Sequence, residues 1–340
     1  MRHINIPIFI PHLGCPNQCI FCNQRYISGN EAFDENNVKS EIESVLSTVN
    51  SDDDCEIAFF GGSFTGIDRS LMIRLLDLAQ EYVLSGRVSG IRMSTRPDYI
   101  SEEIIEILKK YTISYVELGI QSMNDSVLSY LKRGHTVNDT INAIFLLKEA
   151  NISFVGQMMI GLPKATIEDE LYCAEQICHY GASAVRIYPT LVFKNTELEI
   201  MTHNEEYIPI SCDEAVERAA KVLNVFNQHN VTCIRIGLSD SENLHSSKTF
   251  VAGPNEPSIG EMVKSRLYYD IICKKLNDCC DKDIVIECAK GKLSQVIGNK
   301  RKNINDLRNK FQLKDVKVIE NDLLTNYDIR ILKKEEAICV

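Results

Sequence analysis

Three cysteines near the start of the chain are the residues best suited to chemistry. Cys15, Cys19 and Cys22 lie in the stretch GCPNQCIFCNQR, separated by three and then two residues. Three thiolates can hold three irons of a [4Fe–4S] cluster and leave the fourth iron open to a small molecule. The spacing therefore predicts a catalytic iron–sulfur cluster rather than a simple store of electrons.

Zinc is the main alternative for the same loop. Structural zinc sites usually have four protein ligands, often in two separated pairs, and no second pair of cysteines lies near this one. His12 could supply a fourth ligand, so the spacing alone leaves zinc open. Three unrelated thiols are the remaining alternative.

The cysteine stretch resembles the signature of radical S-adenosylmethionine (SAM) enzymes, and Phe21 matches the aromatic residue usual between the last two cysteines. The resemblance implies that the open iron binds the amino and carboxylate groups of SAM. It also implies that the reduced cluster cleaves SAM to a 5′-deoxyadenosyl radical, which abstracts hydrogen from the substrate. A flavodoxin- or ferredoxin-type protein would supply the electron.

Strand-like and helix-like segments alternate over the first 240 residues. The strand patterns cover 4–10, 56–60, 90–94, 115–120, 154–162 and 184–189, and the helical patterns cover 35–50, 69–84, 101–111, 124–132, 137–150 and 166–180. Alternation of this kind indicates parallel βαβ units. We therefore expect an α/β protein with an incomplete parallel (β/α)6 barrel, as the resemblance also implies, with the active site at the carboxyl ends of the strands.

Small and polar residues follow the second and third predicted strands. Gly61, Gly62 and Ser63 follow the second strand, and Ser94 ends the third. Two adjacent glycines also suit an ordinary tight turn. The resemblance implies that the glycine stretch meets the SAM amino group through backbone oxygen, with Ser63 in place of the family's acid. It implies that Ser94 contacts the ribose or the amino-acid part of SAM.

Four longer polar side chains follow the later strands. The chain also resembles oxygen-independent coproporphyrinogen III oxidase, in which the residue matching Gln121 contacts SAM and the residue matching Arg133 meets its carboxylate. A guanidinium group suits a carboxylate because it donates two parallel hydrogen bonds. Gln157 stands where this branch often carries an acid toward the adenosine ribose, and Arg186 could meet the SAM carboxylate or the substrate.

Two local patterns concern helix starts. Thr166 and Asp169, in the stretch QMMIGLPKAT, read as a variant of the capping box. That stretch resembles the G-L-P-x-x-T segment of coproporphyrinogen oxidase and of the Elongator catalytic subunit. Arg96 and Asp98 could cap the helix that follows the third strand.

The composition changes near residue 240, which predicts a partial barrel over 1–240 and a C-terminal extension over 241–340. The string AGPNEPSIGEMVKSRLYY resembles the extension of Elongator-catalytic-subunit-like radical SAM proteins, and we expect no acetyltransferase domain within these residues. The later string VIGNKRKNINDL resembles the helix–G-x-x-G–helix element of KH domains, with Arg301 in place of the second glycine. In KH domains that loop clamps the nucleic-acid backbone.

Charge is concentrated in the same segment. Residues 289–317 include nine lysines and arginines but only two aspartates. This segment therefore has a charge of +7 within a chain whose net charge is −10. We therefore expect Lys300, Arg301 and Lys302 to bind RNA phosphates. A solvated helix on a small α/β domain is the alternative.

The other cysteines and the apolar runs bear on location. The chain has 13 cysteines, most without framework spacing, and its opening residues predict no signal peptide. No run approaches the roughly 18 apolar residues that span a bilayer, so we expect a cytoplasmic protein. Cys273, Cys279, Cys280 and Cys288 could hold an auxiliary cluster, although adjacent cysteines are poor ligands and buried free thiols are common.

Two classes of function fit these patterns. The first is a radical SAM enzyme that modifies tRNA or, alternatively, a small molecule such as a porphyrinogen. The second is a non-catalytic iron–sulfur or zinc protein that binds RNA. A protein that only binds RNA does not need polar groups to converge at several strand ends, so convergence of Gln121, Arg133, Gln157 and Arg186 would favour the enzyme.

Overall fold

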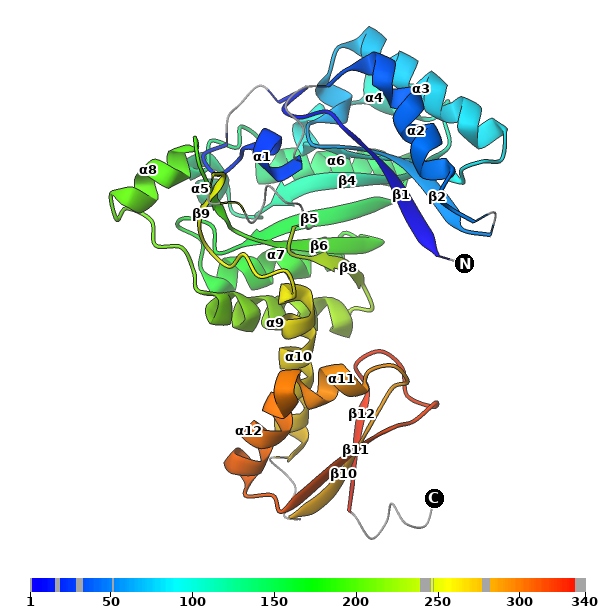
Figure 1. Cartoon of the computed structure of the whole chain (residues 1–340). Coiled ribbons are helices and arrows are strands. Elements are labelled where there is room, and N and C mark those ends of the chain that lie inside the picture. Colours follow the sequence, from blue (N-terminus) through cyan, green and yellow to red (C-terminus); the bar gives the residue numbers. More distant parts are fainter. Residues whose placement is uncertain are drawn as a thin grey trace. The chain divides into compact units, whose positions relative to one another are not determined.

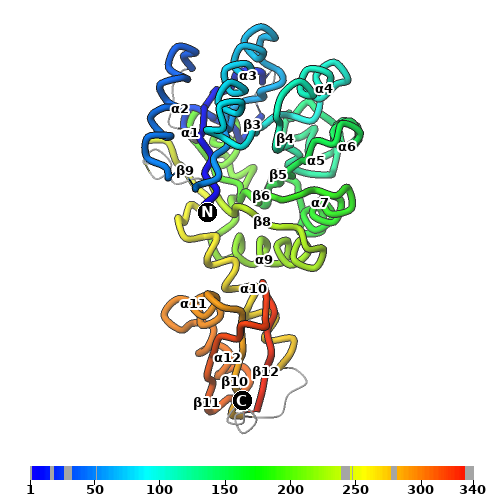
Figure 2. Tube along the Cα trace, turned by 90° about the vertical axis from the view of Figure 1, so that its right-hand side faces the viewer, coloured from blue at the N-terminus to red at the C-terminus, as the bar shows by residue number. Residues whose placement is uncertain are grey.

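The structure is a computed structural model that describes residues 2–15, 19–28, 33–50, 52–238, 246, 248–276 and 282–333. Its chain is shown from two directions in Figures 1 and 2. It forms two compact units. The first comprises Met1–Ser211 and Val231–Asn255, and the second comprises Cys212–Asn230 and Glu256–Val340.

A curled half-barrel sheet of seven parallel strands builds the first unit, in the order β1-β2-β3-β4-β5-β6-β8. The strands are β1 His3–Phe9, β2 Asp54–Phe60, β3 Gly90–Thr95, β4 Ile113–Gln121, β5 Phe154–Ile160, β6 Ala184–Pro189 and β8 Thr232–Ile236. The six predicted strands and the partial barrel are confirmed. The sequence pattern missed β8, an edge strand whose side chains are all at least partly exposed and which therefore lacks the apolar alternation of the others.

Helices cover the outer side of this sheet, as Figure 2 shows for α3, α4, α6 and α7. The helices of the first unit are α1 Gln24–Ser28, α2 Val38–Leu46, α3 Arg69–Leu84, α4 Glu102–Leu108, α5 Asp125–Tyr130, α6 Val137–Glu149, α7 Ile167–His179 and α8 Glu197–His203. The capping box at Thr166 and Asp169 is confirmed. Arg96 and Asp98 do not cap α4, because the Ser101 hydroxyl accepts the hydrogen bond there. Arg96 is instead the N-cap residue of the short 3-10 helix Pro97–Tyr99, where its side chain makes no capping hydrogen bond.

The alternation of side chains along each strand separates a core from a cavity. In β4, Val116, Leu118 and Ile120 are fully buried apolar residues. The intervening Glu117 and Gly119 line a cavity inside the half-barrel. Because successive side chains of a strand point to opposite faces, one strand serves both the core and the site.

The loops after β1 and β2 pack closely against each other at glycine residues. The backbone N–H of Ser63 donates to the Leu13 carbonyl at 2.9 Å, and that of His12 donates to the Gly61 carbonyl at 3.1 Å. A Cβ atom on Gly62 would lie 2.4 Å from the Leu13 oxygen and 2.5 Å from the Ile10 oxygen. Gly62 is therefore needed so that the loop carrying the cysteines can pack on its neighbour.

The second unit contains α9 Cys212–Gln228, α10 Ile259–Leu276 and a three-stranded sheet in the order β11-β10-β12. β10 Asp283–Cys288 runs parallel to β11 Asp315–Glu320 and antiparallel to β12 Ile329–Lys333. Between β10 and β11 lie α11 Leu293–Ile297 and α12 Lys302–Phe311. This strand–helix–helix–strand order contains the two helices that the KH resemblance predicted.

No described helix in either unit is both long enough and apolar enough to cross a membrane.

We expect Gly62→Ala to lower the free energy of unfolding by about 2–3 kcal/mol, because the new methyl group meets two backbone oxygens that cannot move separately. Gly86→Ala is the control. Gly86 has a φ of 73° and no atom within 4 Å of an added Cβ, so it carries the cost of backbone strain alone, about 1 kcal/mol. Denaturant unfolding measures both, and equal stability of the two variants would contradict the packing argument.

Candidate functional site

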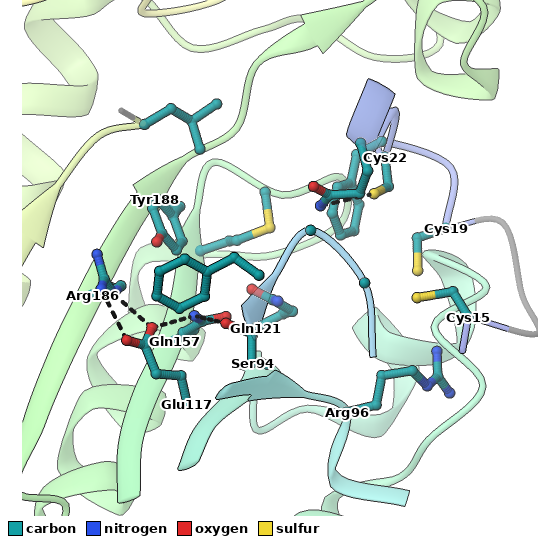
Figure 3. A pocket seen from close by; sticks show the side chains of 18 of the residues that line it. Cys15, Cys19, Cys22, Ser94, Arg96, Glu117, Gln121, Gln157, Arg186 and Tyr188 are labelled. Atoms are coloured by element: carbon teal, nitrogen blue, oxygen red, sulfur yellow. Dashed lines mark hydrogen bonds and ion pairs between the residues drawn. The ribbon is translucent and has the colours of Figure 1, made fainter. Parts of the chain in front are cut away.

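A cavity of about 240 Å³ lies inside the half-barrel of the first unit. It brings together the three cysteines and the predicted cofactor-binding residues Phe21, Gly61, Gly62, Ser94, Gln121, Arg133, Gln157 and Arg186. Ser63 is the predicted residue that does not line it. Figure 3 shows the thiols at one end and Glu117, Arg186 and Tyr188 at the other.

The environment of the cysteines favours the neutral thiol. Burial, together with the neighbouring thiols of Cys19 and Cys15, raises the pKa of Cys22 to about 12. Burial also raises the pKa of Cys15, although the nearby Arg133 guanidinium opposes this. Iron would supply the positive charge that converts these thiols to thiolates.

The donor set fits a cluster better than zinc. Within the described ranges, no three His, Cys, Asp or Glu side chains are grouped to hold one metal ion. A cubic cluster does not need such a group, because each thiolate binds a different iron. His12 is also engaged, since its Nε2 accepts the backbone N–H of Gln24 at 2.9 Å. Burial and then Arg25 lower the pKa of His12, which favours the neutral ring.

Arg133 lies next to the cysteines with part of its guanidinium unused. Its Nη2 donates to the Gly119 carbonyl at 2.9 Å, and its Nη1 lies 3.5 Å from the Cys19 sulfur. Its Nε is buried and has no hydrogen-bond partner among the described residues. A buried donor without a partner is costly, so Arg133 is ready for an anionic ligand beside the cluster.

Gln121 places a hydrogen-bond acceptor in the same cavity as Arg133. Its φ is 65°, and it sits where the register between β4 and β5 shifts. Its Oε1 is buried and meets no hydrogen-bond donor in the described part of the chain. Strained backbone and unsatisfied polar atoms gather at ligand sites, and these two features suit the polar groups of SAM.

Ser63 acts behind the cavity wall. Its hydroxyl lies 2.9 Å from that of Thr95 and accepts the backbone N–H of Arg96 at 3.0 Å. The Arg96 side chain is fully buried and donates to Asp98 at 2.9 and 2.7 Å. Ser63 therefore holds the end of β3 against the β2 loop.

Glu117 is a central residue of the cavity that the sequence patterns did not predict. Glu117 is completely buried and accepts from Arg186 through both oxygens, at 2.7 and 2.9 Å, and from Arg92 at 3.2 Å. Arg186 is thus already paired within the protein. Charged residues inside the apolar strands YVELGI and GIRMS were the signal that could have found Glu117 and Arg92.

The basic residues Lys300, Arg301 and Lys302 lie in the second unit, at the turn between α11 and α12. All three are exposed, and none forms an ion pair with a described residue. Lys300 and Arg301 have φ values of 49° and 61°, so Arg301 adopts the left-handed conformation expected of the glycine that it replaces. The turn presents three free cations to solvent.

Two of the cysteines considered for an auxiliary cluster belong to the core of the second unit. Cys273 and Cys288 are buried among apolar residues of that unit. Cys279 and Cys280 lie outside the described residues.

Comparison with known proteins places the chain among SAM-dependent enzymes. The radical SAM superfamily matches residues 9–175, and the radical SAM C-terminal domain matches residues 182–269. The tRNA uridine(34) acetyltransferase of Methanocaldococcus jannaschii is 37% identical over 134 residues, which are 38% of this chain and 25% of the relative. Elongator complex protein 3 of Saccharomyces cerevisiae is 31% identical over 140 residues, 39% of this chain and 25% of the relative.

The archaeal Elp3 structure from Methanocaldococcus infernus is 25% identical, with a TM-score of 0.61 over 80% of this chain and 63% of that one. The chain thus spans about a quarter of the length of the two curated relatives. The matched regions contain the cysteine loop, six of the seven strands of the half-barrel and the cavity residues. The chain therefore belongs to the radical SAM superfamily, an enzyme family whose cofactors are a [4Fe–4S] cluster and SAM.

Proposed function

We propose that the protein modifies tRNA by hydrogen abstraction. A bound [4Fe–4S] cluster and SAM would supply the radical chemistry, and Cys15, Cys19 and Cys22 would hold the cluster. The observation that carries the proposal is the convergence in one cavity of three thiols and two buried polar atoms, Arg133 Nε and Gln121 Oε1, that lack a hydrogen-bond partner among the described residues, in a chain that also presents a basic turn. The relatives named for tRNA modification support tRNA as the substrate class.

Each cavity residue has a proposed role toward the cofactors. Cys15, Cys19 and Cys22 hold the cluster, and Arg133 receives the SAM carboxylate. Arg133 is preferred to Arg186 because Glu117 already occupies the guanidinium of Arg186. Phe21, Gly61, Gly62, Ser94, Gln121 and Gln157 complete the SAM site, Phe21 by packing and the others by polar or backbone contacts.

Apolar side chains line much of the remaining wall and would keep water from a reactive intermediate. They are Phe9, Phe60, Met159, Leu191, Phe193 and Leu238. We propose that a flavodoxin- or ferredoxin-type protein in the cytoplasm delivers the electron.

The basic turn is the proposed RNA contact. The Asn303 side chain is buried and donates to the carbonyls of Val296 at 3.1 Å and Ser265 at 3.0 Å, which fixes the turn to α10 and α11. Lys300, Arg301 and Lys302 are therefore displayed from a rigid support, as phosphate contacts require. In this proposal residues 1–240 carry out the reaction and 241–340 bind the RNA.

The function is tested with reduced, cluster-loaded protein and tRNA from cells that lack the gene. We expect this tRNA to increase the formation of 5′-deoxyadenosine severalfold over the rate without RNA. Nucleoside analysis should show one modified nucleoside that is missing from the deleted strain and returns with the enzyme. Unchanged nucleosides together with stimulation by a porphyrinogen would instead favour a small-molecule substrate.

Replacing any one of the three loop cysteines by alanine should reduce the bound iron from about four atoms per chain to nearly none, because each thiolate anchors a separate iron. Cys178→Ala is the control, since Cys178 lies on α7 and does not line the cavity. Iron and sulfide are measured in anaerobic preparations, and circular dichroism checks the fold. One zinc ion and no sulfide in the parent protein would contradict the cluster assignment.

Replacing Lys300, Arg301 and Lys302 together by glutamate should weaken tRNA binding severely. The slope of log affinity against log salt should become shallower by about two to three, because fewer counterions are released from phosphates. The matched control replaces three other lysines by glutamate. They are Lys274, Lys275 and Lys282, which are exposed in the same unit and lie outside the turn. SAM cleavage without RNA should be unchanged in both variants.

Filter binding over a salt series measures the effect. If the two triple variants lost tRNA affinity equally, the net charge of the unit rather than the turn would explain binding.

A further inference from the structure

Glu117 constrains a neighbouring side chain that lines the cavity. Its Oε2 accepts the Gln157 Nε2 at 2.8 Å, and the same Nε2 donates to the Ser94 hydroxyl at 3.3 Å (Figure 3). A carboxylate accepts hydrogen bonds but does not donate them. The Gln157 amide must therefore turn its nitrogen toward Glu117, which leaves its oxygen for the cavity.

Glu117 is itself held from both sides. Arg186 on β6 grips both of its oxygens, and Arg92 on β3 contacts Oε1. In turn, Nε of Arg92 lies 2.9 Å from Oε2 of Glu56 on β2. The carboxylate cannot rotate away without breaking buried ion pairs, so the orientation of the Gln157 amide is fixed before any ligand binds.

We propose that Glu117 is a positioning residue that makes Gln157 a hydrogen-bond acceptor toward a sugar hydroxyl in the cavity. A free glutamine amide could present either its oxygen or its nitrogen, whereas this one presents oxygen alone. The arrangement gives a neutral residue the hydrogen-bonding character of an acid. The hydroxyl belongs to the ribose of SAM or to a ribose of the substrate, and the proposal rests on assigning this cavity to SAM.

The test measures binding of 5′-deoxyadenosine and of its analogues that lack the 2′- or the 3′-hydroxyl. Equilibrium dialysis uses the anaerobic, cluster-loaded protein. We expect the parent to prefer the complete ribose over one of the analogues by about tenfold, since a net hydrogen bond is worth about that factor. In E117Q and in Q157L this preference should fall to near one.

E56Q is the matched control. It removes a buried carboxylate that contacts the same Arg92 but does not touch Gln157. It should reduce the stability of the protein and keep the ribose preference. A loss of preference in E56Q equal to that in E117Q would overturn the proposal, because general loosening of the sheet would then explain both.

The double variant E117Q/Q157E keeps one carboxylate among the buried charged residues and restores a hydrogen-bond acceptor at position 157. It should regain the ribose preference, and it carries the test if E117Q does not fold. If the double variant folds but shows no preference, the acceptor role of position 157 is overturned.

A second arm identifies the source of the hydroxyl by comparing an RNA oligonucleotide with DNA of the same sequence. If E117Q reduces the preference for 5′-deoxyadenosine over its deoxy analogues, the hydroxyl belongs to the ribose of SAM. If E117Q reduces only the preference for RNA over DNA, the hydroxyl belongs to a ribose of the substrate. If E117Q changes neither, the proposal fails. The nucleoside arm uses no RNA, so its result stands whether or not tRNA is the substrate.

Discussion

Four charged side chains inside the half-barrel pair with opposite charges on other strands. Removing a charge from water costs several kcal/mol, and that cost is offset here by a continuous series of ion pairs. Glu56, Arg92, Glu117 and Arg186 alternate in sign across strands β2, β3, β4 and β6. The series links strands that are distant in the sequence, and it gives the cavity a polar wall of defined orientation.

The cysteine end of the cavity depends on backbone packing rather than on charge. The loops after β1 and β2 meet at Gly14 and Gly62, where a Cβ atom would overlap with backbone oxygens of the other loop. The thiols are thereby brought to the cavity next to Arg133, whose Nη1 lies 3.5 Å from the Cys19 sulfur. The ion pairs form one end of the cavity, and the cysteine loop forms the other. The space between these two ends is proposed to hold SAM.

The two units carry different electrostatic features. The buried ion pairs of the first unit are neutralised within the sheet, and they act on ligands only at short range. The turn at Lys300, Arg301 and Lys302 is exposed and unneutralised by described residues, so it can act on a polyanion over about a Debye length, roughly 10 Å at moderate salt. The radical SAM matches end at residue 269, and this turn follows them in the sequence.

Local patterns in the sequence determined six strands and six helices of the first unit, the capping box at Thr166 and the cysteine loop, because each depends on neighbours a few residues apart. Most of the cavity residues could also be predicted, since parallel strands bring their carboxyl ends to one edge. Only the tertiary structure showed that Glu117 pairs with Arg92, Gln157 and Arg186, which lie 25, 40 and 69 residues away. It also decided that Ser63 lies behind the wall and that Gly62 is needed for loop packing. Such contacts depend on the register between strands and on how two loops meet, and no local pattern encodes either.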